Sequence, residues 1–119
     1  MWWGVAVEAP QPHELATFYS RLLDWPIAGE DNGSVIVSAP EGSIYLVVQP
    51  ASDFEPPTWP PAPGSQRPMM HLDFQVSDLE AAVTEAVALG ARLTDEQPNS
   101  TVRVLRDPAG HPFCLSINT

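Results

Sequence analysis

The sequence predicts an α+β fold of two βαβββ modules, and three observations lead to this prediction. Polar and apolar residues alternate strictly over 71–76, which is typical of a half-buried strand, and Ser77-Asp78 follows as a helix N-cap signal. The same order of elements occurs earlier, where an alternating segment over 2–8 precedes a helix. An offset of 67 residues (78 minus 11) superimposes the strand-to-helix junctions at Gln11 and Asp78. A repeat of this kind determines the architecture, so it takes precedence over the other features of the sequence.

The first module is predicted over about residues 1–49. Pro10 and Pro12 end its first strand, and Pro12 suits the first turn of a helix, where a missing N–H is no loss. Apolar residues at three- and four-residue spacing then predict an amphipathic helix over 12–23. The elements expected after it are an extended piece at 25–28, a hairpin-type turn at Asp31-Asn32-Gly33, and strands at 34–38 and 43–49.

A proline-rich linker is predicted over about residues 50–68. Its prolines exclude a central strand or a helix interior, so we expect semi-rigid, extended backbone. The linker carries Trp59, which we expect either to plug the edge of the core or to cover a pocket. The second module follows over about 69–119, with strands at 70–76, 101–106 and 112–117, a helix at 78–89 capped by Gly90, an extended piece at 91–94 and a turn at 107–110.

Length and composition indicate a single domain over residues 1–119. No apolar run approaches the roughly 20 residues that span a bilayer, and the N-terminus lacks the basic start of a signal peptide. A lone cysteine excludes an internal disulfide and favours a cytoplasmic location. The net charge of -10 argues against nucleic acid or an anionic membrane as partner, because phosphate contacts need clustered Lys and Arg. It favours a cationic ligand, or serves solubility alone.

The repeat also assigns side chains to faces of the sheets. The offset of 67 pairs Gly4 with His71 on the face away from the helix, and an offset of 69 in the last strands pairs Tyr45 with Cys114. We expect the two open faces to form a cup around a small ligand. The residues predicted to face this ligand are Glu8, Tyr45, Gln49, Trp59, His71, Asp73, Arg103 and Cys114.

Several motifs resemble one superfamily. Phe18-Tyr19 followed by Leu22-Leu23-Asp24-Trp25-Pro26 is similar to the FY-x-x-LLGW signature of the glyoxalase/bleomycin resistance/extradiol dioxygenase (vicinal oxygen chelate) superfamily, with Asp24 in place of the usual glycine. Met70-His71-Leu72-Asp73-Phe74 and Asp107-Pro108-Ala109-Gly110-His111-Pro112 extend the match into the second half. The sequence most resembles bacterial glyoxalase-like domain proteins, which implies two βαβββ modules forming a curved, mostly antiparallel sheet around a cup.

The resemblance also bears on metal binding. Metal-dependent members ligate a divalent cation with one residue from the first and one from the last strand of each module, and these positions correspond here to Gly4, Tyr45, His71 and Cys114. Only His71 matches the usual His and Glu ligands. We therefore predict no cofactor and no metal; if a divalent metal binds, His71 and Cys114 would ligate it.

Two further candidates come from the residues themselves. Cys114 near His71 suggests a Cys–His pair, although nothing in the sequence predicts the cation, helix N-terminus or metal that would lower the pKa of the thiol. Arg103, opposite in phase to Val102 and Val104, is expected either to reach the cup as a cation or to lie on the surface.

The sequence thus predicts a small-molecule-binding, glyoxalase-like homodimer with a degenerate metal site and an aromatic or cationic ligand. The alternatives are a metal-dependent lyase, isomerase or dioxygenase of the same superfamily and a bleomycin-type antibiotic-binding resistance protein. Whether the protein is an enzyme stays open at this point.

Overall fold

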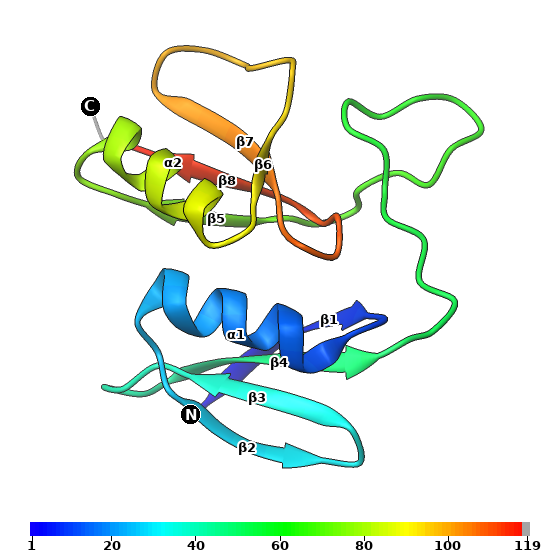
Figure 1. Cartoon of the computed structure of the whole chain (residues 1–119), viewed down its shortest axis with the longest axis vertical. Coiled ribbons are helices and arrows are strands. Elements are labelled where there is room, and N and C mark those ends of the chain that lie inside the picture. Colours follow the sequence, from blue (N-terminus) through cyan, green and yellow to red (C-terminus); the bar gives the residue numbers. More distant parts are fainter. Residues whose placement is uncertain (118–119) are drawn as a thin grey trace. The chain divides into compact units, whose positions relative to one another are not determined.

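A computed structural model describes residues 1–117 of the chain. The offset of 69 also predicts that Gln49 corresponds to Asn118, and this correspondence lies outside the described residues. Contacts divide the chain into two compact units, Met1–Phe54 and Glu55–Thr119, and each has the order βαβββ (Figure 1). The elements are β1 (Trp3–Ala9), α1 (Pro12–Leu23), β2 (Ile27–Asp31), β3 (Ser34–Ser38), β4 (Ile44–Pro50), β5 (Leu72–Gln75), α2 (Leu79–Ala88), β6 (Arg92–Leu93), β7 (Val102–Arg106) and β8 (Pro112–Ser116). The predicted α+β fold is confirmed.

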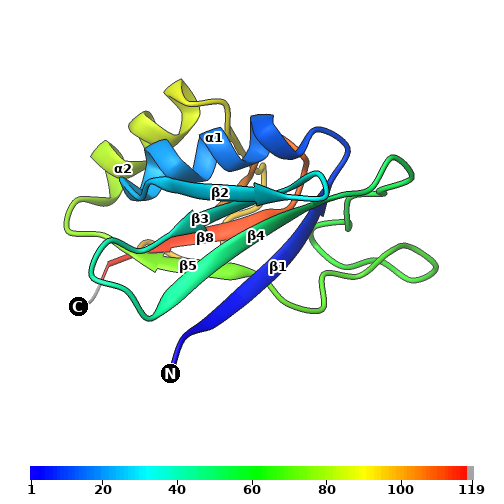
Figure 2. The same cartoon turned by 90° about the horizontal axis from the view of Figure 1, so that it is seen from below.

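The first unit is a four-stranded sheet in the order β1-β4-β3-β2, with α1 across one face (Figure 2). Strands β1 and β4 are parallel, and the other neighbours are antiparallel. Alternate residues of the strands point toward the helix and are buried there with its apolar stripe. The buried residues of this core are Ala9, Leu15, Ala16, Phe18, Tyr19, Val35, Val37, Leu46 and Val48.

Helix α1 ends at Asp24, at the position where the family signature has glycine. Asp24 has φ 56° and ψ 44°, which is the left-handed conformation, and its backbone N–H donates to the carbonyl of Ser20. Glycine enters this region without strain, whereas aspartate is one of the few other residues that tolerate it. The departure from the signature therefore keeps the same chain reversal.

The second unit repeats this arrangement with the sheet order β5-β8-β7-β6, and α2 packs against it. The predicted N-cap is confirmed, because the Asp78 carboxylate accepts a hydrogen bond from the N–H of Ala81 at 3.0 Å. One detail of the prediction is wrong, because the strand expected to begin at residue 70 begins only at Leu72.

The structure corrects the register between the last strands of the two units. Val5 lies opposite Leu46 in the first sheet, and Leu72 lies opposite Phe113 in the second. Since Val5 and Leu72 correspond in the repeat, Leu46 corresponds to Phe113, and the offset of 67 (113 minus 46) holds for these strands too.

The predicted offset of 69 is therefore wrong by two residues, and Tyr45 corresponds to Pro112 instead of Cys114. Two residues are one full period of a strand, so both registers keep every side chain on the same face. The polar and apolar pattern could not distinguish them. The lengths of the turns do distinguish them. In the turn before β8, the N–H of Asp107 donates to the carbonyl of His111. The corresponding bond of the first unit, from the N–H of Ala39 to the carbonyl of Ile44, encloses one residue more.

From Glu55 onward, the proline-rich segment packs within the second unit. Nη1 of Arg106 donates to the carbonyl oxygens of Pro57 and Gly110, at 2.9 and 2.7 Å. Gly110 has φ 101°, and a Cβ built there would lie 2.7 Å from Cβ of Pro56, so a residue without a side chain is required. The segment is thus fixed against the turn between β7 and β8.

Candidate functional site

The face of the first sheet away from α1 carries three of the predicted site residues. Glu8 lies opposite Gln49 in the β1–β4 pair, and both are exposed. Tyr45 lies opposite Gly4, and its ring covers the Gly4 Cα so closely that a Cβ there would meet two ring carbons at 2.6 Å. The ring of Tyr45 thus occupies the space that a side chain at position 4 would need.

The corresponding face of the second sheet carries Asp73 and Cys114, which lie directly opposite each other. The hydroxyl of Ser116, on the same face, donates to Oδ1 of Asp73 at 3.2 Å. Cys114 is a free cysteine with 7% of its surface exposed. Burial raises the pKa of its thiol, and the negative charge of Asp73 raises that pKa further.

This environment does not suit an activated cysteine. A reactive or metal-binding cysteine must be a thiolate, which requires a lowered pKa. His71 precedes β5 by one residue, and the residue opposite Cys114 is Asp73, a carboxylate that disfavours the thiolate. The geometry therefore gives the suggested Cys–His pair no support.

Trp59 lies against His71 within the second unit. Their ring centroids are 6.0 Å apart at an interplanar angle of 71°, an edge-to-face contact between an exposed histidine and a half-buried tryptophan. Trp59 also lines a pocket of about 370 Å³ with the β6 segment and Arg106. It is therefore part of a pocket wall; that it covers a pocket as a lid stays a prediction.

The structure places Arg103 on the wrong face for the predicted cup. Arg103 lies opposite Leu115, which lies opposite Phe74 on the face toward α2. Its Nη1 donates to the carbonyls of Asn99 and Val102, and its side chain lines a second pocket of about 330 Å³ beside α2. The expectation that it reaches the open face is wrong.

The reason for this error lies in β7, an inner strand with apolar residues on both faces. Val104 and Leu105 are both fully buried, although they point to opposite sides of the sheet. The prediction for Arg103 assumed that Val102 and Val104 point toward the helix. In the structure Leu105 points toward α2 and Val104 points to the open face.

Sequence reasoning missed the charged residues around the pocket at Trp59. Arg92 lies directly opposite Arg106 in the β6–β7 pair, and Asp95 and Glu96 follow β6. Nothing in the sequence pairs Arg92 with Arg106, because the strand that carries Arg92 is only two residues long, so no sequence signal indicated this pocket.

A divalent metal, which members of the superfamily use, does not fit the residues that the structure describes. The position of Gly4 has no side chain and is covered by Tyr45, and the raised pKa of the Cys114 thiol opposes metal ligation. Over residues 1–117, no group of three or more His, Cys, Asp or Glu side chains is arranged to hold a metal ion.

Comparison with protein families shows to which family the chain belongs. The glyoxalase-like domain model matches residues 4–116, so the chain belongs to the glyoxalase-like domain family. The search of curated proteins finds no significant match. In the described part of the chain, neither helix is both long and apolar enough to cross a bilayer.

Solved structures share the fold at low sequence identity. The fosfomycin resistance protein FosX from Listeria monocytogenes has a TM-score of 0.73 at 12% identity, covering 100% of this chain and 91% of that one. The antibiotic-binding protein TnmS3 from Streptomyces sp. CB03234 has a TM-score of 0.66 at 13% identity, covering 100% and 96%. A glyoxalase/bleomycin resistance protein from Albidiferax ferrireducens T118 has a TM-score of 0.66 at 20% identity, covering 100% and 99%.

The contact between Gly4 and Tyr45 generates a stability prediction. Gly4→Ala should lower the free energy of unfolding by about 1–3 kcal/mol, because the new Cβ forces the Tyr45 ring from its place. Denaturant titration measures this change. Gly29→Ala is the matched control: a Cβ there meets nothing within 4 Å, so stability should be unchanged or slightly higher. Equal stability of the two variants would contradict the close contact.

The environment of Cys114 generates a second prediction. The rate of alkylation by iodoacetamide should rise with pH to a midpoint above that of an ordinary thiol, because burial and Asp73 both disfavour the thiolate. Asp73→Asn should move the midpoint downward, while Asp53→Asn, at an exposed site of the first unit, should not. A midpoint below the ordinary value would instead indicate an activated thiolate.

Proposed function

We propose that this protein binds a small molecule at the open face of its second unit and does so without a metal. The observation that carries the proposal is the position of Trp59, whose ring contacts His71 and which also lines a pocket of about 370 Å³. Pockets that bind small molecules have volumes of roughly 300–1,000 Å³ and combine aromatic walls with a few polar groups.

Two solved structures of this fold have names that indicate small-molecule binding or resistance. An antibiotic-binding protein and a fosfomycin resistance protein share this fold, which supports a role in binding or resistance. A metal-dependent reaction would need ligands where this chain has Gly4 and Tyr45, and a thiolate where the pKa of Cys114 is raised. The residues therefore favour a ligand-binding protein over a metal-dependent lyase, isomerase or dioxygenase.

The ligand we propose is aromatic, and cationic on the side that faces the open sheet. Trp59 and His71 offer flat surfaces for stacking, and Asp73 adds an exposed carboxylate on the face that continues from His71. A cation over an aromatic face contributes roughly 0.5–2 kcal/mol. The net charge of -10 attracts a cation over longer distances.

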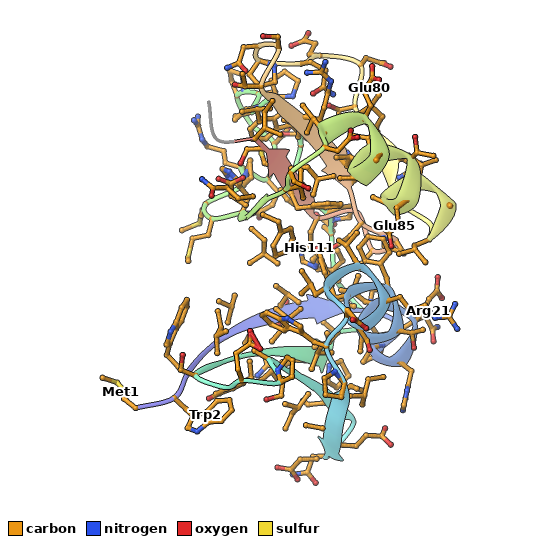
Figure 3. All side chains as sticks on the ribbon, turned by 90° about the vertical axis from the view of Figure 1, so that its left-hand side faces the viewer. Met1, Trp2, Arg21, Glu80, Glu85 and His111 are labelled. Carbon is orange, nitrogen blue, oxygen red and sulfur yellow. The ribbon has the colours of Figure 1, made fainter. Side chains whose placement is uncertain are left out.

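We further propose that two copies of the chain associate. Strands β1 and β5 are edge strands of their sheets, and edge strands expose backbone groups that can pair with another chain. Met1 and Trp2 lie at the free start of β1 (Figure 3), where Trp2 and Trp3 are each 55% exposed. Met70, just before β5, is 83% exposed. Apolar side chains beside edge strands support a homodimer.

Calorimetric titration with aromatic, cationic antibiotics, bleomycin first, tests the binding proposal. We expect a micromolar dissociation constant for at least one compound. Trp59→Ala and His71→Ala should each weaken it about tenfold, because each removes a stacking surface worth roughly 1.4 kcal/mol. His13→Ala, an exposed histidine of the first unit, should leave it unchanged.

Two outcomes would contradict the binding proposal. The first is affinity that neither variant changes, with both variants folded by circular dichroism. The second is binding that disappears after chelation and returns with added zinc or nickel, which would restore the metal-dependent alternative.

Light scattering behind a sizing column tests the association. We expect about twice the 12.9 kDa mass of one chain. Met70→Glu should shift the protein toward the monomer by placing a charge among apolar side chains. Val87→Glu, which adds the same charge at an exposed site on α2, should not. A monomeric wild-type chain at 100 micromolar or so would exclude the homodimer.

A further inference from the structure

The pocket beside Trp59 contains an arrangement of charges that the family and the proposed function do not explain. It lies wholly within the second unit, between the proline-rich segment and strands β6 and β7, and has a volume of about 370 Å³. The residues that matter for its chemistry are Trp59, Arg92, Asp95, Glu96 and Arg106. Four of these five are charged, two with each sign.

The two arginines lie side by side on neighbouring strands. Arg92 and Arg106 are direct cross-strand partners, so their side chains leave the sheet on the same side. Like charges directly opposite on neighbouring strands are destabilising unless an anion lies between them. The Arg106 side chain is partly satisfied by the carbonyls of Pro57 and Gly110, whereas the Arg92 side chain has no hydrogen bond or ion pair within residues 1–117.

The two carboxylates lie on a turn that side-chain hydrogen bonds hold in place. The hydroxyl of Thr94 donates to the carbonyls of Glu96 and Val104 at 3.0 and 3.1 Å. Gln97 forms hydrogen bonds through both ends of its amide. Its Nε2 donates to the carbonyls of Thr94 and Val104, and its Oε1 accepts from the N–H of Val104 at 2.8 Å. Asp95 and Glu96 are therefore fixed at the rim of the pocket.

These carboxylates do not neutralise the arginines. Within the described residues, neither Asp95 nor Glu96 forms an ion pair with Arg92 or Arg106. Charges of both signs thus line one pocket without pairing, and both remain available to a ligand. A ligand with a single charge would satisfy one pair and leave the other unmatched.

Trp59 supplies the third element of the pocket, and its position is also fixed. The N–H of Thr58 donates to the carbonyl of Gln66 at 2.8 Å, which closes a loop around Trp59, and Arg106 fixes the segment just before it. A pocket whose walls are held before the ligand arrives loses less conformational entropy on binding.

We propose that this pocket binds a small aromatic zwitterion of the α-amino acid type. Its carboxylate lies between Arg92 and Arg106, its ammonium group binds Asp95 and Glu96, and its flat group packs on Trp59. This inference rests on the proposed small-molecule function, which it deepens by naming the chemical class and by adding residues on β6 and β7 to Trp59.

Calorimetric titration with three related probes tests the proposal. L-phenylalanine carries both charges, 3-phenylpropionate lacks the ammonium group, and 2-phenylethylamine lacks the carboxylate. We expect phenylalanine to bind at least fivefold more tightly than either of the others, because charge-assisted hydrogen bonds form at both ends of it.

Two variants locate the two ends of the probe. Arg92→Gln should weaken phenylalanine binding at least fivefold and leave phenylethylamine binding unchanged, whereas Arg21→Gln makes the same change in net charge on α1 and should alter neither. Glu96→Gln should weaken phenylalanine binding and leave phenylpropionate binding unchanged or stronger. Glu41→Gln, at an exposed turn, is its control.

The proposal is overturned if phenylalanine fails to bind below about 10 mM, a dissociation constant too weak for a specific site. It is also overturned if the three probes bind equally or if Arg92→Gln has no effect. An antibiotic that still binds in a His71-dependent manner would then show that small-molecule binding stands while the zwitterion site does not.

Discussion

The guanidinium group of Arg106 is the interaction on which the second unit's candidate site depends. By donating to Pro57 and Gly110 at once, it joins the proline-rich segment to the turn before β8. Proline has no backbone N–H, so a proline-rich segment contains few donors for its own buried or half-buried carbonyls. These carbonyls need donors from elsewhere in the chain. This bond, together with the close packing of Pro56 against Gly110, holds the segment just before Trp59 near β7. One arginine therefore helps to make a linker part of the candidate site.

Local chemistry made most of the fold predictable. The alternation after His71, the cap at Asp78 and the helical spacing in the first unit each depend on neighbours in sequence, and the repeat supplied the long-range order. The register of β8 was not predictable in the same way. A shift of two residues leaves every side chain on the same face of the sheet. The polar and apolar pattern around Cys114 therefore could not show which residue of the first unit corresponds to it.

The candidate site was predictable only in part, since contacts between distant segments decide it. The sequence placed Glu8, Gln49 and Tyr45 on one face, and Asp73 and Cys114 on another, as the strand ladders do. It could not indicate that Val104 and Leu105 are buried on opposite sides, and so misplaced Arg103. It also gave no reason to pair Arg92 with Arg106, because β6, the strand that carries Arg92, is only two residues long.

The ring of Tyr45 over Gly4 has a consequence for engineering a metal site into this fold. A side chain that could bind a metal cannot be introduced at position 4 by one substitution, because the aromatic ring already fills that volume. Tyr45 must be replaced by a smaller residue at the same time. The two replacements act on one shared space, so their effects on stability do not add, and an engineered metal ligand at this position has to be designed as a pair.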